Sequence, residues 1–175
     1  MIVISDAGPL IALAKIGSLP VIFQLSSMVL IPPAVFEETV VAGLRLGLAD
    51  AESISSYHAG GQLLVVPVQP TRLELPEEVD PGEREGILLA LQEQADWLLV
   101  DDLRARAVAE AIFASQGVKT RVRGTLGLLV EAFRQGVLTR SETIERLRAL
   151  EAHPDIWLHE SLIRWAIDAI SQTRD

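Results

Sequence analysis

The feature that most constrains the fold is an alternation of short apolar runs with segments of helical pattern. Five apolar runs are predicted to be strands, at 2–4, 28–31, 63–68, 97–100 and 118–122. Helices are predicted between and after them, at 10–16, 32–42, 83–95, 102–116 and 124–135. Strands that alternate with helices form a mostly parallel sheet that is covered on both faces. The sequence therefore predicts an α/β fold with a parallel sheet of about five strands flanked by helices.

Glycine, proline and capping residues set the expected ends of these segments. We expect Gly43 to close the helix at 32–42 and Ser141 to cap a helix in the C-terminal part of the chain. Between them, 44–61 is ambiguous, and Asp50 could cap a helix that reaches His58. The proline-bearing stretch 69–81 is predicted to be a loop, and a last helix is predicted over 159–171.

Composition narrows the function classes. The chain has 175 residues, of which 49% are apolar, enough for one substantial core. Its 15 basic and 24 acidic residues give a net charge of −9, which argues against a broad basic surface for nucleic acid. With no cysteine, disulfides and thiolate chemistry are excluded. No run approaches the roughly 20 apolar residues of a membrane span, and no basic region precedes the first apolar run, so a cytoplasmic protein is expected.

Acidic residues stand just after the strands or at the starts of the helices. They are Asp6, Glu37, Glu38, Glu83, Glu85, Asp101 and Asp102. In open α/β sheets, ligands bind beyond the carboxyl ends of the strands. Several carboxylates at one edge repel one another unless a cation lies among them, and hard oxygen ligands suit Mg²⁺ or Mn²⁺. Such an ion can activate water against a phosphodiester.

Each of these residues also has an ordinary structural interpretation, which the residues alone leave open. Asp6, Asp101 and Asp102 could cap helices, and the glutamates could complement helix dipoles. Asp80, which precedes Pro81, is typical of a turn. The functional interpretation rests on the joint pattern.

In that joint pattern the sequence resembles the PIN-domain family of nucleases, in a branch close to the VapC-type toxins. The resemblance spans roughly residues 1–137 and rests on VISDAGPLIAL, IPPAVFEETV, DPGEREGILLAL, WLLVDDLRARAVAEA and VRGTLGLLVEAFRQG. It implies a PIN-like, Rossmann-like fold over a single domain, 1–175. The core would cover about 1–137, and a helical extension would cover 138–175.

The resemblance also implies a set of site residues. Asp6, Glu38, Glu83 and Asp102 match the catalytic acids, with Glu37 as the alternative to Glu38. The metal, Mg²⁺ or Mn²⁺, would be held by Asp6, Glu83, Asp101 and Asp102. Two departures from the toxin pattern are present: Glu83 stands where many toxins have aspartate, and Val100 and Asp101 stand where many have a hydroxyl residue.

A local basic patch is the candidate contact for substrate phosphate. It comprises Arg104, Arg121 and Arg123, with Arg106 and Lys119 nearby, and Thr125 is a candidate hydroxyl. Pairing of these arginines with neighbouring acidic residues is the equally weighted alternative.

The C-terminal segment is rich in apolar residues, which either pack on the sheet or meet a partner. They are Ile156, Trp157, Leu162, Ile163, Trp165, Ile167 and Ile170. The resemblance implies an RNA substrate, an antitoxin protein and a homodimer. Two functions are therefore carried forward: a metal-dependent ribonuclease, as the toxin of a toxin–antitoxin pair, and a catalytically inactive PIN-like domain that binds nucleic acid or regulates.

Overall fold

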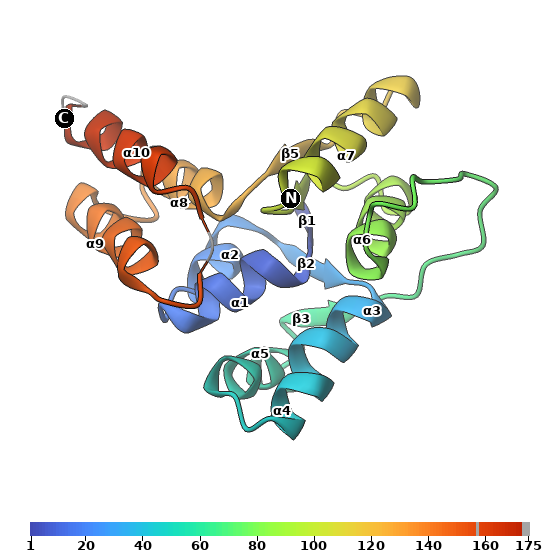
Figure 1. The fold of residues 1–175 in the computed structure, drawn as a ribbon, viewed down its shortest axis with the longest axis horizontal. Coiled ribbons are helices and arrows are strands. Elements are labelled where there is room, and N and C mark those ends of the chain that lie inside the picture. The colour runs from blue at the N-terminus through green and yellow to red at the C-terminus, as the bar shows by residue number, and fades with distance from the viewer. Residues whose placement is uncertain (157, 173–175) are drawn as a thin grey trace.

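The computed structural model describes residues 1–156 and 158–172, and within them the chain forms a five-stranded parallel sheet (Figure 1). Its strand order is β3-β2-β1-β4-β5. The strands are β1 (Ile2–Ser5), β2 (Met28–Ile31), β3 (Leu63–Val65), β4 (Trp97–Leu99) and β5 (Arg121–Arg123). The predicted α/β sheet flanked by helices is confirmed.

The central strand β1 pairs with β2 on one side and with β4 on the other. Ile4 pairs with Leu30 and with Leu98, so the three strands end at nearly the same level. The residues that directly follow these strands therefore lie together at the carboxyl edge of the sheet. Asp6 follows β1 at this edge, and its backbone N–H donates to the carbonyl of Leu99 at 2.9 Å.

Two groups of helices cover the two faces of the sheet. The helical segments are α1 (Ala7–Lys15), α2 (Pro20–Leu25), α3 (Pro33–Phe36), the π-helix η1 (Glu37–Ala42), α4 (Gly43–Arg45), α5 (Ala49–Ala59), α6 (Pro81–Gln92), α7 (Leu103–Ser115), α8 (Thr125–Arg134), α9 (Arg140–Ala152) and α10 (Glu160–Gln172). Alternate strand residues face opposite ways. Val3 and Leu99 join a core with α1, α2, α5, α8, α9 and α10, whereas Ile4 and Leu98 join a second core with α6 and α7.

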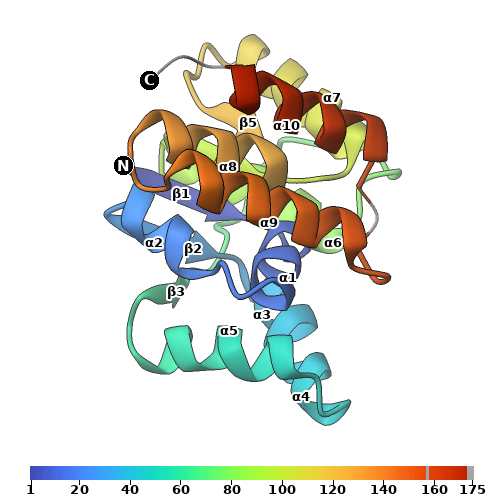
Figure 2. The same cartoon turned by 90° about the vertical axis from the view of Figure 1, so that its left-hand side faces the viewer.

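The C-terminal helices extend the first of these cores. In Figure 2, α8, α9 and α10 lie side by side, and α10 packs on both of the others. Ile163 and Ile170 of α10 are buried, so part of the apolar C-terminal segment packs within the chain. Trp157 lies outside the described residues. In the part of the chain that the structure describes, no helix has the length and apolar character to cross a membrane.

Gly43 does not close the helix that begins after β2. Its φ of −61° is helical, and the chain turns only at Gly47, where φ is +67°. A Cβ on Gly43 would lie 2.5 Å from the Cβ of Ala51, so the glycine is required by the close approach of α5.

The predicted cap Ser141 was wrong, and the cap considered at Asp50 does not form. Helix α9 is capped by Thr139 rather than Ser141, because Glu142 completes a capping box with Thr139. Helix α5 begins at Ala49, so Asp50 lies in the first turn and caps nothing. A favourable acid near a helix start does not by itself decide which residue is the cap.

Two strand boundaries differ from the prediction for reasons of hydrogen bonding. The strand predicted over 63–68 is shorter, since Pro67 has no N–H to continue the ladder. The strand predicted over 118–122 begins later, because the N–H of Val118 closes α7 by donating to Phe113. Arg123 is therefore inside β5 rather than after it.

Candidate active site

Asp6 lies where β1 gives way to α1, at the carboxyl edge of the sheet. Its side chain accepts from the N–H of Gly8 at 3.5 Å, which is long for a hydrogen bond and makes it a weak cap. Burial, together with the charges of Asp80 and Glu83, raises the pKa of Asp6 to about 7. The side chain is therefore poorly solvated and crowded by other acids, which is unusual for a simple turn residue.

Asp80 and Glu83 form a capping box at the start of α6. The N–H of Glu83 donates to Asp80 Oδ1 at 2.8 Å, and the N–H of Asp80 donates to Glu83 Oε2 at 3.1 Å. Gly82 lies between them, and a Cβ there would be 3.4 Å from Asp6 Oδ1 and 3.5 Å from Asp80 Oδ1. The absence of a side chain at Gly82 thus lets the start of α6 approach Asp6.

Glu38 enters the site from the π-helix η1. The wider π turn is frequent at functional sites, and here it follows directly on α3. Burial raises the pKa of Glu38, and the charge of Asp80 raises it further. Glu37 instead pairs with Arg45 at 3.7 Å and is well exposed. Glu38, not Glu37, is the residue whose charge interacts with the other acids.

Glu85 has a different position from the other acids. Its Oε2 accepts from the N–H of Ala34 at 3.0 Å, so it satisfies the start of α3. This bond joins α6 to the helix that leads into Glu38, and it supports the geometry of the site from outside.

Asp101 and Asp102 follow β4 but are held differently. Asp101 accepts from Thr125 Oγ1 at 2.6 Å and from the Thr125 N–H at 2.7 Å, which satisfies the start of α8. Asp102 Oδ1 accepts from the N–H groups of Arg104 and Ala105, at 2.8 Å and 2.9 Å, and caps α7. The charge of Asp102 raises the pKa of Glu83, whereas Asp101 is engaged by Thr125.

Charge interactions connect the predicted acids into one group. Burial is the largest cause of the raised pKa of Glu83, and the charges of Asp80, Asp102 and Glu38 add to it. Asp6 is coupled to the same group through Asp80 and Glu83. Acids from four distant segments therefore lie near enough to repel one another.

The donor set fits a hard divalent cation. It consists of carboxylates, and Mg²⁺ commonly uses only one or two carboxylates with several waters. Among residues 1–156 and 158–172, no three Asp, Glu or His side chains are close enough to enclose an ion without moving. A bound cation would therefore be held by one or two of these carboxylates unless others reorient.

The predicted arginines separate into two environments. Burial raises the pKa of Asp101, and the charge of Arg106 beside it opposes that rise. Arg106 Nη1 is 3.3 Å from where a Cβ of Gly124 would be. Arg104 is exposed on the first turn of α7. These two arginines lie on the same helix that Asp102 caps.

Arg123 and Arg121 lie on β5. Arg123 stacks over Trp97 at 4.5 Å and pairs with Glu131 at 3.2 Å. Arg121 is exposed. Its strand partner is Trp97, the first residue of β4, so Arg121 lies at the amino end of the sheet. The structure does not bring Arg121 to the level of the carboxylates, and it engages Arg123 in internal contacts.

Asp80 was predicted only as a turn residue, and its involvement in the acidic group was not predicted from the sequence. The signal was present, since an aspartate followed three residues later by Glu83 is a capping-box pattern. The capping box explains the local contact, but only the fold shows that the charge of Asp80 also acts on Asp6 and Glu38.

A family model described as a PIN domain matches residues 2–172, which is nearly the whole chain. Neither the search of curated proteins nor the search of solved structures found a match.

Proposed function

Because the chain belongs to the PIN-domain family, we propose that it is a divalent-metal-dependent ribonuclease that hydrolyses phosphodiester bonds. PIN domains are generally nucleases. The observation that carries the finer proposal is the mutual repulsion of Asp6, Glu38, Glu83 and Asp102 at the carboxyl edge. An uncompensated group of this kind is costly, and a divalent cation relieves the cost.

In this proposal Asp6 holds Mg²⁺ or Mn²⁺ together with Glu83 or Asp102, or with both once their side chains reorient, and Glu38 completes the catalytic acids. The bound ion would supply a lowered pKa for water and charge stabilisation for the phosphate oxygens. Asp101 was also predicted to bind the metal. Since Thr125 occupies its oxygens, we assign Asp101 to holding the start of α8 and Arg106 beside the site.

The cleavage test uses the purified chain and a structured RNA. We expect cuts in Mg²⁺ or Mn²⁺ and none in excess EDTA. Asp6→Asn, which keeps the side-chain shape, is the matched inactive variant. Cleavage that continues unchanged in EDTA would overturn the metal mechanism. Metal-independent RNA binding without any cleavage would favour the alternative, an inactive PIN-like binding or regulatory domain.

We propose that Arg104 and Arg106 contact substrate phosphate, with Arg121 further along the path and Thr125 at the α8 start. Replacing Arg104 and Arg106 with alanine should weaken RNA binding. It should also make the plot of log binding constant against log salt concentration less steep, by the equivalent of up to about two phosphate contacts. Replacing Arg121 and Arg123 with alanine tests the two β5 arginines of the basic patch that was predicted from the sequence. Equal salt slopes for wild type and both double variants would place the RNA elsewhere.

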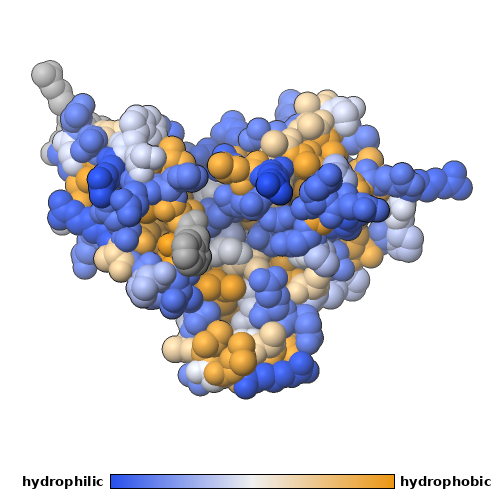
Figure 3. All heavy atoms as spheres, viewed as in Figure 1, coloured by the Kyte–Doolittle hydropathy of each residue, from blue (hydrophilic) through white to orange (hydrophobic). Residues whose placement is uncertain are grey.

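We further propose that this nuclease is a cytoplasmic toxin whose partners are an antitoxin protein and a second copy of the chain. Exposed apolar side chains support a protein partner: Leu46 is 75% exposed and Trp165 is 70% exposed. Figure 3 shows hydrophobic atoms exposed at the tip formed by α4. Growth arrest on expression, and a dimer mass in light scattering that is lost on truncation after Leu150, are the expected results. A truncated chain that remains a dimer would exclude the C-terminal helices from the dimer contact.

A further inference from the structure

A pocket of about 230 Å³ opens beside the carboxylates, between α1 and the connection from α9 to α10. Gly8, Glu38 and Asp101 border it on the side of the candidate active site. Ile156 and Leu158 line it from the C-terminal part of the chain. Residues separated by more than a hundred positions thus enclose one space next to the acids.

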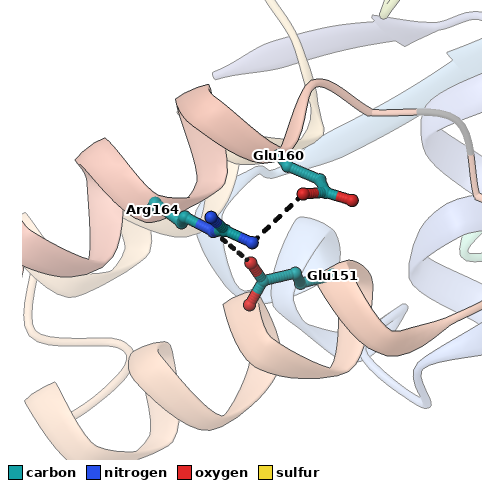
Figure 4. A network of polar contacts seen from close by, with 3 residues as sticks. All are labelled: Glu151, Glu160 and Arg164. Atoms are coloured by element: carbon teal, nitrogen blue, oxygen red, sulfur yellow. Dashed lines mark hydrogen bonds and ion pairs between the residues drawn. The ribbon is translucent and has the colours of Figure 1, made fainter.

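The described ends of this connection are held in place by ion pairs. Arg164 on α10 donates from Nε to Glu151 on α9 at 2.9 Å and from Nη2 to Glu160 at 3.1 Å (Figure 4). Asp155 pairs with Lys15 of α1 at 3.6 Å. Surface ion pairs thus link the residue before Ile156 to α1 and link α9 to α10.

The pocket is suited in size and lining to a single planar base. Its volume equals that of roughly seven or eight liquid water molecules, and it is smaller than the about 300–1,000 Å³ typical of drug-sized ligands. Ile11 and Ala12 of α1 line it together with Ile156 and Leu158 of the C-terminal connection. An apolar lining of this kind, with acidic side chains beside it, favours a base over a phosphate group.

The charged lining side chains can only accept hydrogen bonds when they are ionised. They are Glu38, Asp101 and Asp155, and Asp101 is already engaged by Thr125. A base that carries an amino group would donate to such a carboxylate from that group, whereas uracil has no amino group and offers only its single ring N3–H. Among the acids that line the pocket, Glu38 belongs to the proposed catalytic group and Asp101 is bound by Thr125. In the described part of the chain, the Asp155 side chain has only a surface ion pair with Lys15.

We propose that this pocket receives one amino-bearing nucleobase of the RNA strand, next to the phosphate that is cleaved, and that Asp155 accepts from its amino group. The proposal rests on the proposed ribonuclease function, because it places the scissile phosphate at the carboxylates. It adds a base preference and assigns that preference to the C-terminal extension.

The test measures binding separately from cleavage. The full chain, with ¹³C-labelled isoleucine methyl groups and in Mg²⁺, is titrated with 5′-GMP, 5′-AMP, 5′-CMP and 5′-UMP. We expect shifts at Ile11 and Ile156 and binding of the best amino-bearing nucleotide about two- to tenfold tighter than UMP. Asp155→Asn should remove that preference. Lys15→Met breaks the same ion pair but keeps the carboxylate, so it should retain the preference.

The outcomes separate the pocket from the reaction. Unmoved Ile11 and Ile156 methyls, or equal affinity for all four nucleotides, would overturn the inference even if RNA is cleaved. Shifted methyls with a preference that Asp155→Asn abolishes would support it even if the chain cuts no RNA. In that case the ribonuclease proposal would fail and base binding would remain.

Discussion

Two helices of this protein begin with the same local motif but differ in what surrounds it. Helix α6 starts with the capping box of Asp80 and Glu83, and α9 starts with that of Thr139 and Glu142. In both boxes, the side chain of the first residue accepts from the backbone N–H of the glutamate three residues later. The carboxylate of that glutamate accepts from the backbone N–H of the first residue. The motif satisfies helix N–H groups in both places, with the shorter backbone bond at Asp80, 2.8 Å against 3.3 Å at Thr139.

The environments of the two glutamates are opposite. Glu83 is 9% exposed, and burial with neighbouring acids raises its pKa. Glu142 is partly exposed, and hydrogen bonds from Thr139 lower its pKa. The difference shows that the fold, not the local motif, makes a capping residue into a candidate for chemistry.

The largest expected effect separates these two glutamates directly. Glu83→Gln should reduce RNA cleavage by more than the roughly 100-fold typical of losing a supporting residue around a metal. Glu142→Gln should leave cleavage within about twofold. Initial rates on one RNA at saturating Mg²⁺ make the comparison. Equal losses in the two variants would mean that Glu83 acts only as a helix cap.

The second prediction concerns the stability of the metal-free protein. The folded-state pKa of Asp6, about 7, exceeds its ordinary value of 3.8, so the folded chain holds this proton to higher pH. The ionisation of Asp6 therefore lowers the free energy of unfolding as pH rises from about 4 to about 7. Asp6→Asn should remove that loss, on the order of 4 kcal/mol at pH 8, and flatten this part of the pH profile.

Urea unfolding in EDTA at pH 5 and pH 8 measures this effect. Asparagine is as good an N-cap as aspartate, so capping does not obscure the result. A variant that is less stable than wild type at pH 8 would contradict the crowding of Asp6 by the other acids.

The third prediction compares the caps themselves. Asp80→Ala and Thr139→Ala should each lower the unfolding free energy by about 1 kcal/mol. Only Asp80→Ala should also lower cleavage, by about 10- to 100-fold, because it releases Glu83. Asp80→Ser restores a cap without the charge and should recover the stability and part of the rate. Full activity in Asp80→Ala would exclude a positioning role for Asp80.

The smallest expected effect belongs to the exposed capping box. The folded-state pKa of Glu142 is lowered, so its contribution to stability is present above the unfolded pKa. That contribution is lost as pH falls through the folded pKa. The difference in melting temperature between wild type and Glu142→Gln should therefore shrink from pH 7 to pH 3. A constant difference would mean that the carboxylate contributes no charge-dependent bond.

The fold was largely accessible from the sequence because buried parallel strands are continuous apolar runs. The strand at 28–31 was predicted with the correct bounds, since its four apolar residues show no helical periodicity. Gly43 was misinterpreted because a helix-ending glycine and a close-packing glycine look alike in one dimension. The distinction requires Ala51, which belongs to another helix.

The residue types of the candidate site could be predicted from the sequence, but the electrostatic interactions between them could not. The expected gathering of Asp6, Glu38, Glu83 and Asp102 agrees with the charge interactions of the structure, while their catalytic roles stay predictions. The sequence could not separate Asp101 from Asp102. That separation depends on Thr125, which arrives from a different strand–helix junction.

The location of the metal tests the central claim most directly. A crystal soaked in Mn²⁺ and measured at the manganese absorption edge should show an anomalous peak within ligand distance of a carboxylate oxygen of Asp6, shared with Glu83 or Asp102. The same soak of Asp6→Asn crystals should give no peak there. A strong peak elsewhere in wild type, with none at this edge of the sheet, would contradict the proposed metal centre.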